Sequence, residues 1–408
     1  MNGRITTLAL AALLAGALTA SASSPFSTLG AGVNLNPMSV RSYALGGNDI
    51  LISDSVYVSS ANPAGWKNVG RTRFMLSSSV GMSTSKDNLA GTDNASSINF
   101  PTVALALPIY RTLGIGFSYK TLTDYGFLTR RPSTITGILP EDSSAAYDVT
   151  ETFSGVGGLS DFSSNFGVSI GKSLSMGIAL DYVFGKLDRV WVMQFSNSNF
   201  SSSGKTIRQE LSGVVVRLGS HYVRGPLMAA ATVQLPASVN VTRSLEIVGG
   251  DSLGIEGGSL ELPLSVNVGG SWQVKRLRTM GQGSFESWSS VTQDVIGTTD
   301  TYSNAWNLAV GFELLPTRSP LDPWYMKWTY RAGGHLGQDY VSATSDPIKN
   351  YGIAMGFGIP VRTHMGMIDL ALTMDWRGDV ATNGVSERIT GIRIGYSSTE
   401  KWFVRRPR

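Results

Sequence analysis

Large apolar side chains recur at every second position in many segments of this chain. In YGIAMGFGIP (residues 351–360) the bulky residues alternate with Gly or Ala, and in MIDLALTMDW (367–376) they alternate with Asp, Ala and Thr. A period of two places successive side chains on opposite faces of a β-strand. The pattern predicts strands with one bulky apolar face and one small or polar face.

The same alternation occurs in residues 113–120, 174–182, 306–314 and 324–331, and no convincing helical period follows residue 22. A soluble sandwich also alternates, with its apolar face inside. Three features favour a membrane barrel instead: the apolar stripes suit strands of about 9–11 residues, the opposite face mixes small and charged residues, and aromatic residues lie near many strand ends. The predicted fold class is all-β, a transmembrane antiparallel β-barrel.

Connection lengths predict the number of strands. Outer-membrane barrels alternate short inner turns with longer outer loops. Short connections are expected near 110–112, 171–173, 223–226, 274–277, 316–321 and 361–364, and longer polar ones at 85–97, 125–162, 197–205, 248–257, 291–302, 336–350 and 378–386. These connections interleave and predict about fourteen strands over residues 71–398, with both chain ends on the short-turn side. Residues 145–160 are interpreted as an outer extension of one strand, kinked at the glycines 155–158.

Charged residues within the strands fall on the small face. A Lys or Arg at the lipid midplane costs about 2–4 kcal/mol, so this face is expected to line the interior. The predicted lumen-facing residues are Lys120, Asp181, Arg217, Glu313, Lys327, Arg331, Asp369 and Asp375.

The first 22 residues have the pattern of a secretory signal peptide. Arg4 precedes the apolar run LALAALLAGALTA, which ends at an A-x-A site (Ala20–Ala22). The run is too short for the roughly 20 residues of a membrane-spanning helix. The chain has no Cys, so no disulfide stabilises it after export. We expect export to the outer membrane of a Gram-negative cell.

Residues 23–70 precede the first strand and are rich in Gly, Ser, Asn and Pro. A disordered linker would be more polar, and a separate periplasmic domain would need a larger core. The remaining interpretation is a small hatch folded into the barrel lumen. Pro63 fixes its own φ and biases Asn62 away from helix, so Asn62-Pro63-Ala64 is expected to form a stiff kink. An ordinary turn is the alternative interpretation of this tripeptide.

SYALGG (42–47) followed by ANPAGW (61–66) resembles the hatch of the long-chain fatty acid transporter (FadL/TodX-like) family. LELPLSVNVGGSWQV (260–274) resembles a strand of that family, and GYSSTEKWFVRRPR (395–408) is similar to the ends of its Bacteroidetes-type relatives, which include a type IX secretion barrel. The resemblance implies a monomeric barrel for passive uptake of hydrophobic compounds, with Asn62, Pro63 and Ala64 as the gating element. Residues 399–408 are then a basic periplasmic tail.

No catalytic, metal or nucleotide motif stands out, so an enzyme, a cofactor and a metal site are not expected. The three histidines are scattered, and no Gly-rich phosphate loop precedes a Lys. The formal charge of +4 is too diffuse for a nucleic-acid partner. The expected partners are outer-membrane lipid and hydrophobic small molecules. Two alternatives to uptake stay open: a scaffold or shuttle for exported proteins, and a general porin.

Overall fold

The computed structural model describes residues 24–400, except 55, 69–70, 89–90, 111, 137–145, 198–199, 248–256, 292–301, 318, 320, 343–345 and 362–365. The predicted signal peptide and the predicted tail from residue 401 lie outside the described residues. The last strand continues to Glu400, two residues into the segment expected to be tail.

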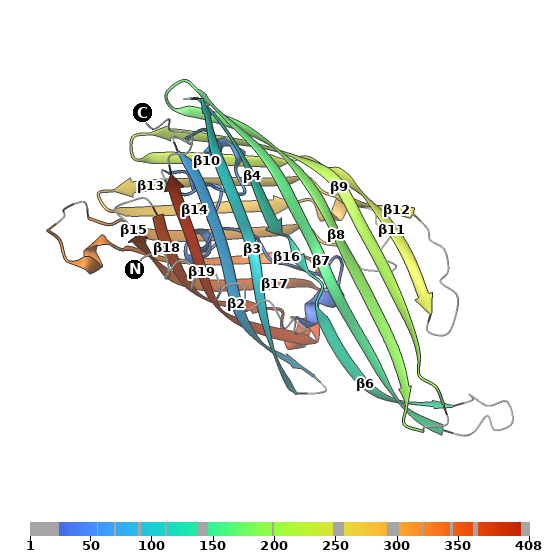
Figure 1. Ribbon diagram of the computed structural model, residues 1–408. Coiled ribbons are helices and arrows are strands. Elements are labelled where there is room, and N and C mark those ends of the chain that lie inside the picture. The colour runs from blue at the N-terminus through green and yellow to red at the C-terminus, as the bar shows by residue number, and fades with distance from the viewer. Residues whose placement is uncertain are drawn as a thin grey trace, which may run out of the picture.

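Most of the described chain consists of antiparallel strands (Figure 1). The strands of the wall are β2 (Thr72–Asp87), β3 (Thr92–Tyr110), β4 (Leu113–Thr121), β6 (Phe127–Thr136), β7 (Ala146–Ile170), β8 (Leu174–Phe195), β9 (Ser203–Arg224), β10 (Leu227–Gln234), β11 (Ala237–Ile247), β12 (Gly257–Leu262), β13 (Ser265–Val274), β14 (Leu277–Glu286), β15 (Ala305–Leu314), β16 (Thr329–Ser342), β17 (Pro347–Val361), β18 (Gly366–Arg377) and β19 (Val385–Glu400). The other elements are η1 (Pro25–Thr28), β1 (Val33–Asn34), α2 (Val40–Ala44), η2 (Pro63–Asn68), β5 (Thr123–Asp124), η3 (Trp288–Ser290), η4 (Trp324–Lys327) and α3 (Val380–Asn383).

The wall closes on itself, because β19 pairs with β2 along sixteen residues. Three pairs of segments each count as one strand of the wall. β4 and β6 both pair with β7, and β10 and β11 both pair with β9. β12 pairs with β11 and β13 pairs with β10, so β12 and β13 together form the next strand. Among the described residues the barrel therefore has fourteen antiparallel strands, which confirms the predicted fold. Closure gives most wall strands a partner on both sides, which lipid could not supply, whereas β6 and β12 each have one described partner.

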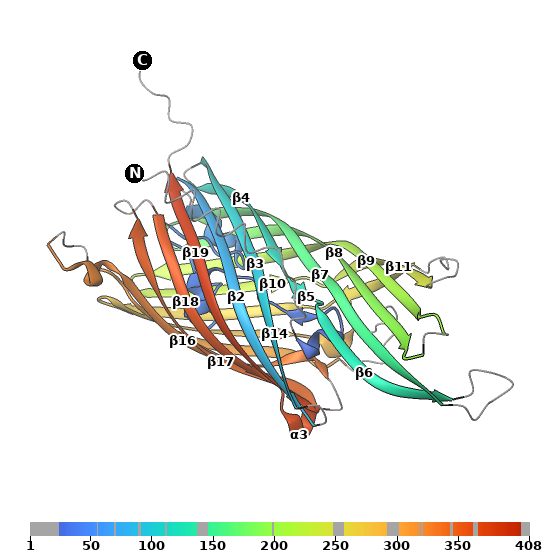
Figure 2. The same cartoon turned by 60° about the horizontal axis from the view of Figure 1, so that its bottom comes forward.

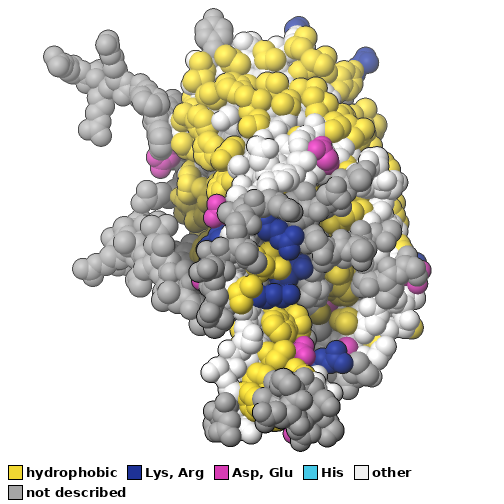
Figure 3. Space-filling model, turned by 90° about the vertical axis from the view of Figure 1, so that its right-hand side faces the viewer, with side chains coloured by type: hydrophobic (Ala, Val, Ile, Leu, Met, Phe, Trp, Pro, Cys, Tyr) yellow, Lys and Arg dark blue, Asp and Glu magenta, His cyan; other side chains and the backbone are white. Residues whose placement is uncertain are grey.

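The two faces of each strand differ as the alternation predicts. On β18, Leu372 is 52% exposed on the outer face, whereas Ala371 and Asp369 on the inner face are buried. On β17, Ile353 and Met355 also point outward. Hydrophobic side chains cover much of the visible flank in Figure 3. No helix among the described residues is long and apolar enough to span a membrane.

The two ends of the barrel differ in length. At the end where β19 finishes, most turns are short, and β2 starts there as well (Figures 1 and 2). At the other end β6 to β9, with β11 and β12 beside them, extend past the remaining strands (Figure 1). The expected outer extension of a strand over residues 145–160 is confirmed by β7. The rest of the predicted loop 125–162 is wrong, because it contains the strand β6, which pairs with the first part of β7 over ten residues. The chain hydrogen-bonds there as a hairpin of strands, with its kink at Gly157 and Gly158, both at positive φ.

One predicted strand start is also wrong. Residues 324–327 form the 3₁₀ helix η4, and β16 begins only at Thr329. Lys327 therefore lies in a fourteen-residue connection between β15 and β16 and not on a lumen-facing strand. The reason is local hydrogen bonding: the Thr317 amide donates to Met326, and the Met326 amide donates to Pro323. These backbone groups are satisfied inside the loop and are not available to a neighbouring strand.

We predict that Leu370→Arg blocks barrel assembly, because Leu370 lies on the outer face of β18 and an Arg in lipid costs about 2–4 kcal/mol. The folded fraction is measured by the heat-dependent shift in gel mobility of outer-membrane extracts. Leu321→Arg is the matched control, because Leu321 is 95% exposed in the connection that contains η4. Equal folded fractions for the two variants would contradict the face assignment.

Candidate functional site: a plugged lumen beside a break in the wall

Residues 24–68 form a hatch that lies inside the barrel and contacts many of its strands. Helix α2 begins after Ser39, whose hydroxyl accepts from the Ser42 amide at 3.1 Å and caps the helix. The hatch residues Leu45, Ile50 and Ile52 are buried against wall residues that include Met280 and Ala230. The hatch therefore has no separate core, and its apolar side chains pack on the inner face of the wall.

The Asn62-Pro63 corner rests on a row of glycines. Gly167, Gly177 and Gly219 pair in register across β7, β8 and β9. A Cβ on Gly167 would lie 2.7 Å from the Pro63 oxygen, one on Gly219 would lie 2.7 Å from Pro63 Cδ, and one on Gly177 would overlap the Pro63 carbonyl carbon. Only glycine lets the hatch backbone approach the wall this closely.

A second glycine row holds the end of α2. Gly311 and Gly333 face each other across β15 and β16. Added Cβ atoms there would lie 2.7 Å from the Leu45 oxygen and 2.8 Å from Leu45 Cα. Gly46, at φ +71°, continues the chain beside this row. The hatch is thus seated at two places on opposite parts of the wall.

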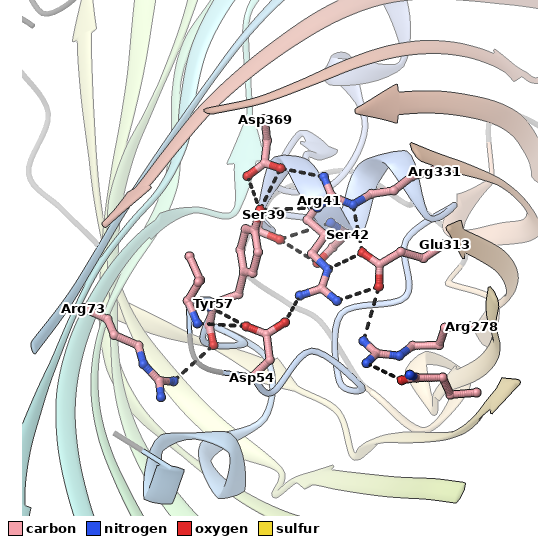
Figure 4. Close-up of polar contacts among 12 residues, drawn as sticks. Ser39, Arg41, Ser42, Asp54, Tyr57, Arg73, Arg278, Glu313, Arg331 and Asp369 are labelled. Carbon is pink, nitrogen blue, oxygen red and sulfur yellow. Dashed lines mark hydrogen bonds and ion pairs between the residues drawn. The ribbon is translucent and has the colours of Figure 1, made fainter. Parts of the chain in front are cut away.

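A buried network of charges ties α2 to the wall (Figure 4). Arg41 donates to both oxygens of Glu313, at 2.9 and 2.7 Å. Arg331 donates to Glu313 at 2.9 Å and to Asp369 at 2.5 Å. The Tyr57 hydroxyl contacts both Asp369 oxygens at 2.8 Å. Removing one member of such a network leaves an uncompensated charge, which typically costs about 3–5 kcal/mol.

Asp54 completes this network on the hatch side. It pairs with Arg41 and accepts the amides of Val56 and Tyr57 at 2.9 and 3.0 Å. Burial by itself raises the pKa of Asp54, but Arg41 and the two amides outweigh it and lower the pKa to about 2. Asp54 is therefore ionised across the physiological range.

The predicted gating tripeptide is fully packed. Asn62 donates its side-chain amide to Ile50 of the hatch at 3.2 Å and to Ser220 of the wall at 3.1 Å. Its Oδ1 accepts the Ala64 amide at 3.0 Å. Asn62 and Ala64 are both completely buried. The side chain of Asn62 thus bridges hatch and wall at the start of η2.

The structure brings most of the predicted lumen residues into two groups. Glu313, Arg331 and Asp369 belong to the Arg41 network. The second group lies on β4, β7, β8 and β9 and consists of two buried ion pairs: Lys120–Asp161 at 2.8 Å and Asp181–Arg217 at 3.0 Å. Asp375 stands apart, half-buried, with its Oδ1 3.7 Å from His335 Nε2. Lys327 joins neither group.

A cavity of about 460 Å³ lies between the hatch and the wall. Its apolar lining includes Leu122, Leu159, Val183, Val215 and Leu260. Its polar lining includes Asp49, Lys120, Asp161, Asp181, Arg217, Asp375, Arg377 and Arg393. Most of these charges are paired, so the cavity offers hydrogen-bonding groups beside an apolar surface. This chemistry suits a molecule with both polar and apolar parts.

The wall is interrupted beside this cavity. β3 pairs with β4 from Thr102 to Tyr110, and β6 pairs with β7, but no described pairing joins β3 to β6. Between β4 and β6 the chain turns inward, and its short strand β5 pairs with β1 of the hatch. Ser97 and Asn99 of β3 and Leu122 to Asp124 of the inward turn all line the cavity. We call this interruption the seam.

Hatch residues hold the seam in shape. The Leu35 amide donates to Leu122 at 2.9 Å, and the Thr123 hydroxyl donates to Ala31 at 2.8 Å. The Tyr125 amide donates to Gly157 at 2.9 Å, at the kink of β7. The inward turn thus bonds to the hatch on one side and keeps bonds to β7 on the other, where the Leu122 amide donates to Leu159 at 2.7 Å. Any displacement of β1 would leave β5 without its partner.

Sequence reasoning missed Arg41, Asp54, Tyr57 and Asp161. Asp161 alternates with Ser163 and Asn165 on the small face of β7, and this spacing could have identified it. Arg41, Asp54 and Tyr57 lie in a segment without periodicity. The wall partners of Arg41 and Tyr57 are 272 and 312 residues away in sequence, and Asp54 joins the network through Arg41. No local signal connects such residues.

We predict that Gly219→Ala loosens the hatch without preventing barrel assembly. The new methyl group would overlap Asn62 and Pro63, and overpacking of this kind costs about 1–3 kcal/mol. Trypsin cleavage after Lys67, which is buried, measures the released fraction in detergent. Gly270→Ala is the control, because the nearest atom to its Cβ is the Met228 oxygen at 3.8 Å. Identical cleavage rates in the two variants would show that the contact between Gly219 and Pro63 does not hold the hatch in place.

We also predict a pH dependence of hatch docking. Because the folded pKa of Asp54 is lowered to about 2 from 3.8, its stabilising contribution is complete above pH 3.8 and is lost as the pH falls toward 2. Planar-bilayer conductance should stay low at neutral pH and rise over this acid window. Asp54→Asn should raise conductance already at neutral pH, whereas Asp322→Asn in the connection before η4 should not. Low conductance of Asp54→Asn at pH 7 would contradict the role of this carboxylate.

The barrel resembles solved structures of transport channels at low sequence identity. A FadL homologue from Pseudomonas aeruginosa matches with a TM-score of 0.57 and 16% identity, over 91% of this chain and 100% of that one. The Pseudomonas putida toluene transporter TodX matches with a TM-score of 0.54 and 13% identity, over 91% and 100%. The CymD monoaromatic hydrocarbon channel matches with a TM-score of 0.53 and 14% identity, over 91% and 99%. No curated protein is similar to this chain in sequence.

These likenesses establish the fold, a closed antiparallel barrel like those of the FadL-like structures, and they confirm the predicted resemblance to FadL-like barrels. The sequence model of the BamG family matches residues 2–407, which is almost the whole chain. The chain therefore belongs to the BamG family and has a FadL-like outer-membrane barrel.

Proposed function

We propose that this barrel lets hydrophobic or amphipathic small molecules cross the outer membrane without an energy source. The observation that carries the proposal is the seam, because the same cavity touches the hatch and the interrupted wall. The solved channels of this fold include a toluene transporter and a monoaromatic hydrocarbon channel, which supports the same class of substrate. The proposal includes signal-peptide-directed export and action as a monomer.

The proposed route leads from the outer end into the cavity and leaves sideways at the seam. An apolar molecule gains about 25 cal/mol for each Å² moved from water to lipid, so a sideways exit is downhill. A straight exit would require the hatch to leave both glycine rows and the Arg41–Glu313 ion pair. A smaller shift of β1 would release only β5. The geometry therefore favours the lateral route.

In this proposal Asn62, Pro63 and Ala64 act as the latch of the hatch. Their contacts with Gly177, Gly219 and Ser220 fix the lower part of the hatch, so that motion is confined to the segment near β1. The polar residues Lys120, Asp161, Asp181 and Arg217 hold the polar part of the substrate while the apolar part reaches the seam. A permanently open porin is disfavoured by the close packing of the hatch.

A second candidate function is a scaffold for exported proteins. The observation in its favour is the extension of β6 to β9 beyond most other strands, at the end opposite the start of β2 and the end of β19 (Figure 1). Such a surface is not required for passage of a small molecule through the cavity. The two functions are compatible in one barrel, since they use different parts of it.

We predict that Pro63→Ala reduces uptake of a hydrophobic tracer such as radiolabelled dodecanoate, with normal barrel assembly. The substitution removes the ring that contacts Gly219 and frees the backbone at the corner, so the latch loses its fixed geometry. Initial uptake rates are compared in cells with equal surface levels of each variant. Pro323→Ala, at the start of η4, is the control for loss of a proline. Wild-type uptake by Pro63→Ala would refute the latch.

A further inference from the structure

The extension at the outer end is a curved sheet with two different faces. It consists of β6, the first half of β7, the later part of β8, the first part of β9, and β11 and β12. Leu187, Leu211 and Val241 point to the inner side, where they form a buried cluster with Ala31 of the hatch. Side chains two residues further along each strand share that side.

This inner side, which we call the mouth face, continues past the buried cluster. Its residues beyond the cluster include Arg189 and Trp191 on β8, Lys205, Ile207 and Gln209 on β9, and Arg243, Leu245 and Ile247 on β11. The register supports one continuous surface, because Trp191 pairs with Lys205, which in turn pairs with Ile247. Lys205 Nζ lies 5.7 Å from the centre of the Trp191 ring.

The cations of the mouth face have no carboxylate partner. Within the described part of the chain, the structure records no ion pair for Arg189, Lys205 or Arg243. Arg189 donates at 2.9 and 2.6 Å to the hydroxyl of Tyr125, a neutral acceptor that leaves its charge uncompensated. The described mouth-face residues of β8, β9 and β11 include no acid; Glu151, on β7, is the nearest one on this side by register.

The opposite face of the same strands is balanced in charge. Lys186 and Arg208 both pair with Asp188, at 3.2 and 3.1 Å. Glu210 lies opposite Lys186 across the β8–β9 pair. The excess of positive charge is therefore specific to the mouth face and is not a general property of the extension. Figure 3 shows Lys and Arg side chains gathered in the hollow at this end of the molecule.

We propose that the mouth face binds an acidic polypeptide segment that also carries apolar side chains. Charge complementarity requires several carboxylates, because Arg189 and Arg243 lie two strands apart, about 10 Å. A fatty acid or detergent has a single charge and cannot neutralise three separated cations. Ile207, Leu245, Ile247 and Trp191 alternate with the cations, so the ligand must also offer apolar groups.

Two other anionic ligands fit less well. A polyanionic polysaccharide lacks the apolar side chains that would cover Ile207, Leu245 and Ile247. Lipid head groups at the membrane surface would meet the outside of the extension, where Asp188 already compensates the cations. An extended peptide with alternating acidic and apolar residues presents both groups at the period of two that a sheet surface has.

The experiment measures binding of a labelled peptide of alternating Glu and Val to the full-length barrel in phosphatidylcholine nanodiscs by fluorescence anisotropy. Lys205→Gln combined with Arg243→Gln should weaken binding about tenfold or more, since both charges lie on the mouth face. Lys186→Gln combined with Arg208→Gln removes the same number of charges from the opposite face and should change binding less than about twofold. Raised salt should weaken binding to the wild type.

Assembly of each variant is checked by gel mobility, and the single variants Lys205→Gln and Arg243→Gln replace the double variant if it does not assemble. Each single variant should weaken binding about threefold. Equal losses in the two double variants, or no peptide binding to the wild type, would overturn the proposal. Binding of heparin or dodecanoate in place of the peptide, with loss in the mouth-face variant, would also overturn it, because the ligand would then be another class of anion.

Discussion

The backbone hydrogen bond is the interaction on which this structure depends. In a hydrocarbon environment an unpaired amide or carbonyl costs several kcal/mol, so the strands must pair on both sides and the sheet must close. Pairing of β19 with β2 completes that closure. Closure then creates an inner face, and the hatch, the ion pairs and the cavity all occupy it. At the seam the inward turn of the chain divides its hydrogen bonds between the hatch, through the β1–β5 pair, and β7 of the wall.

The packing of the hatch explains how a segment without a core of its own can be ordered. Two rows of glycines bring its backbone close to the wall, and Arg41 joins it to Glu313 by two hydrogen bonds. Buried charges are expensive unless fully paired, so this network permits one position of the hatch and penalises others. The result is a fixed lower part near Pro63 and a separate contact at β1. That division supports a lateral route for small molecules.

The two faces of the outer extension differ in whether their cations have carboxylate partners. In the lumen Lys120 and Arg217 have carboxylate partners, and on the outside of the extension Asp188 serves Lys186 and Arg208. Among these described surfaces, only the mouth face has cations without a carboxylate partner. Uncompensated charge destabilises a folded chain slightly, so its retention on one face points to a ligand that supplies the missing charge.

The sequence by itself determined the barrel, its fourteen strands and the faces of most strands, because alternation and loop length are local properties. It also indicated the hatch, since a Gly- and Pro-rich segment precedes the first strand. Tertiary structure alone decided which residues meet: that Gly167, Gly177 and Gly219 align under Pro63, that Arg41 reaches Glu313, and that the connection before β16 folds into η4. These contacts are set by the register of the strands and by closure of the barrel. Register and closure depend on pairing between strands far apart in the chain, and no local pattern of residues encodes such pairing.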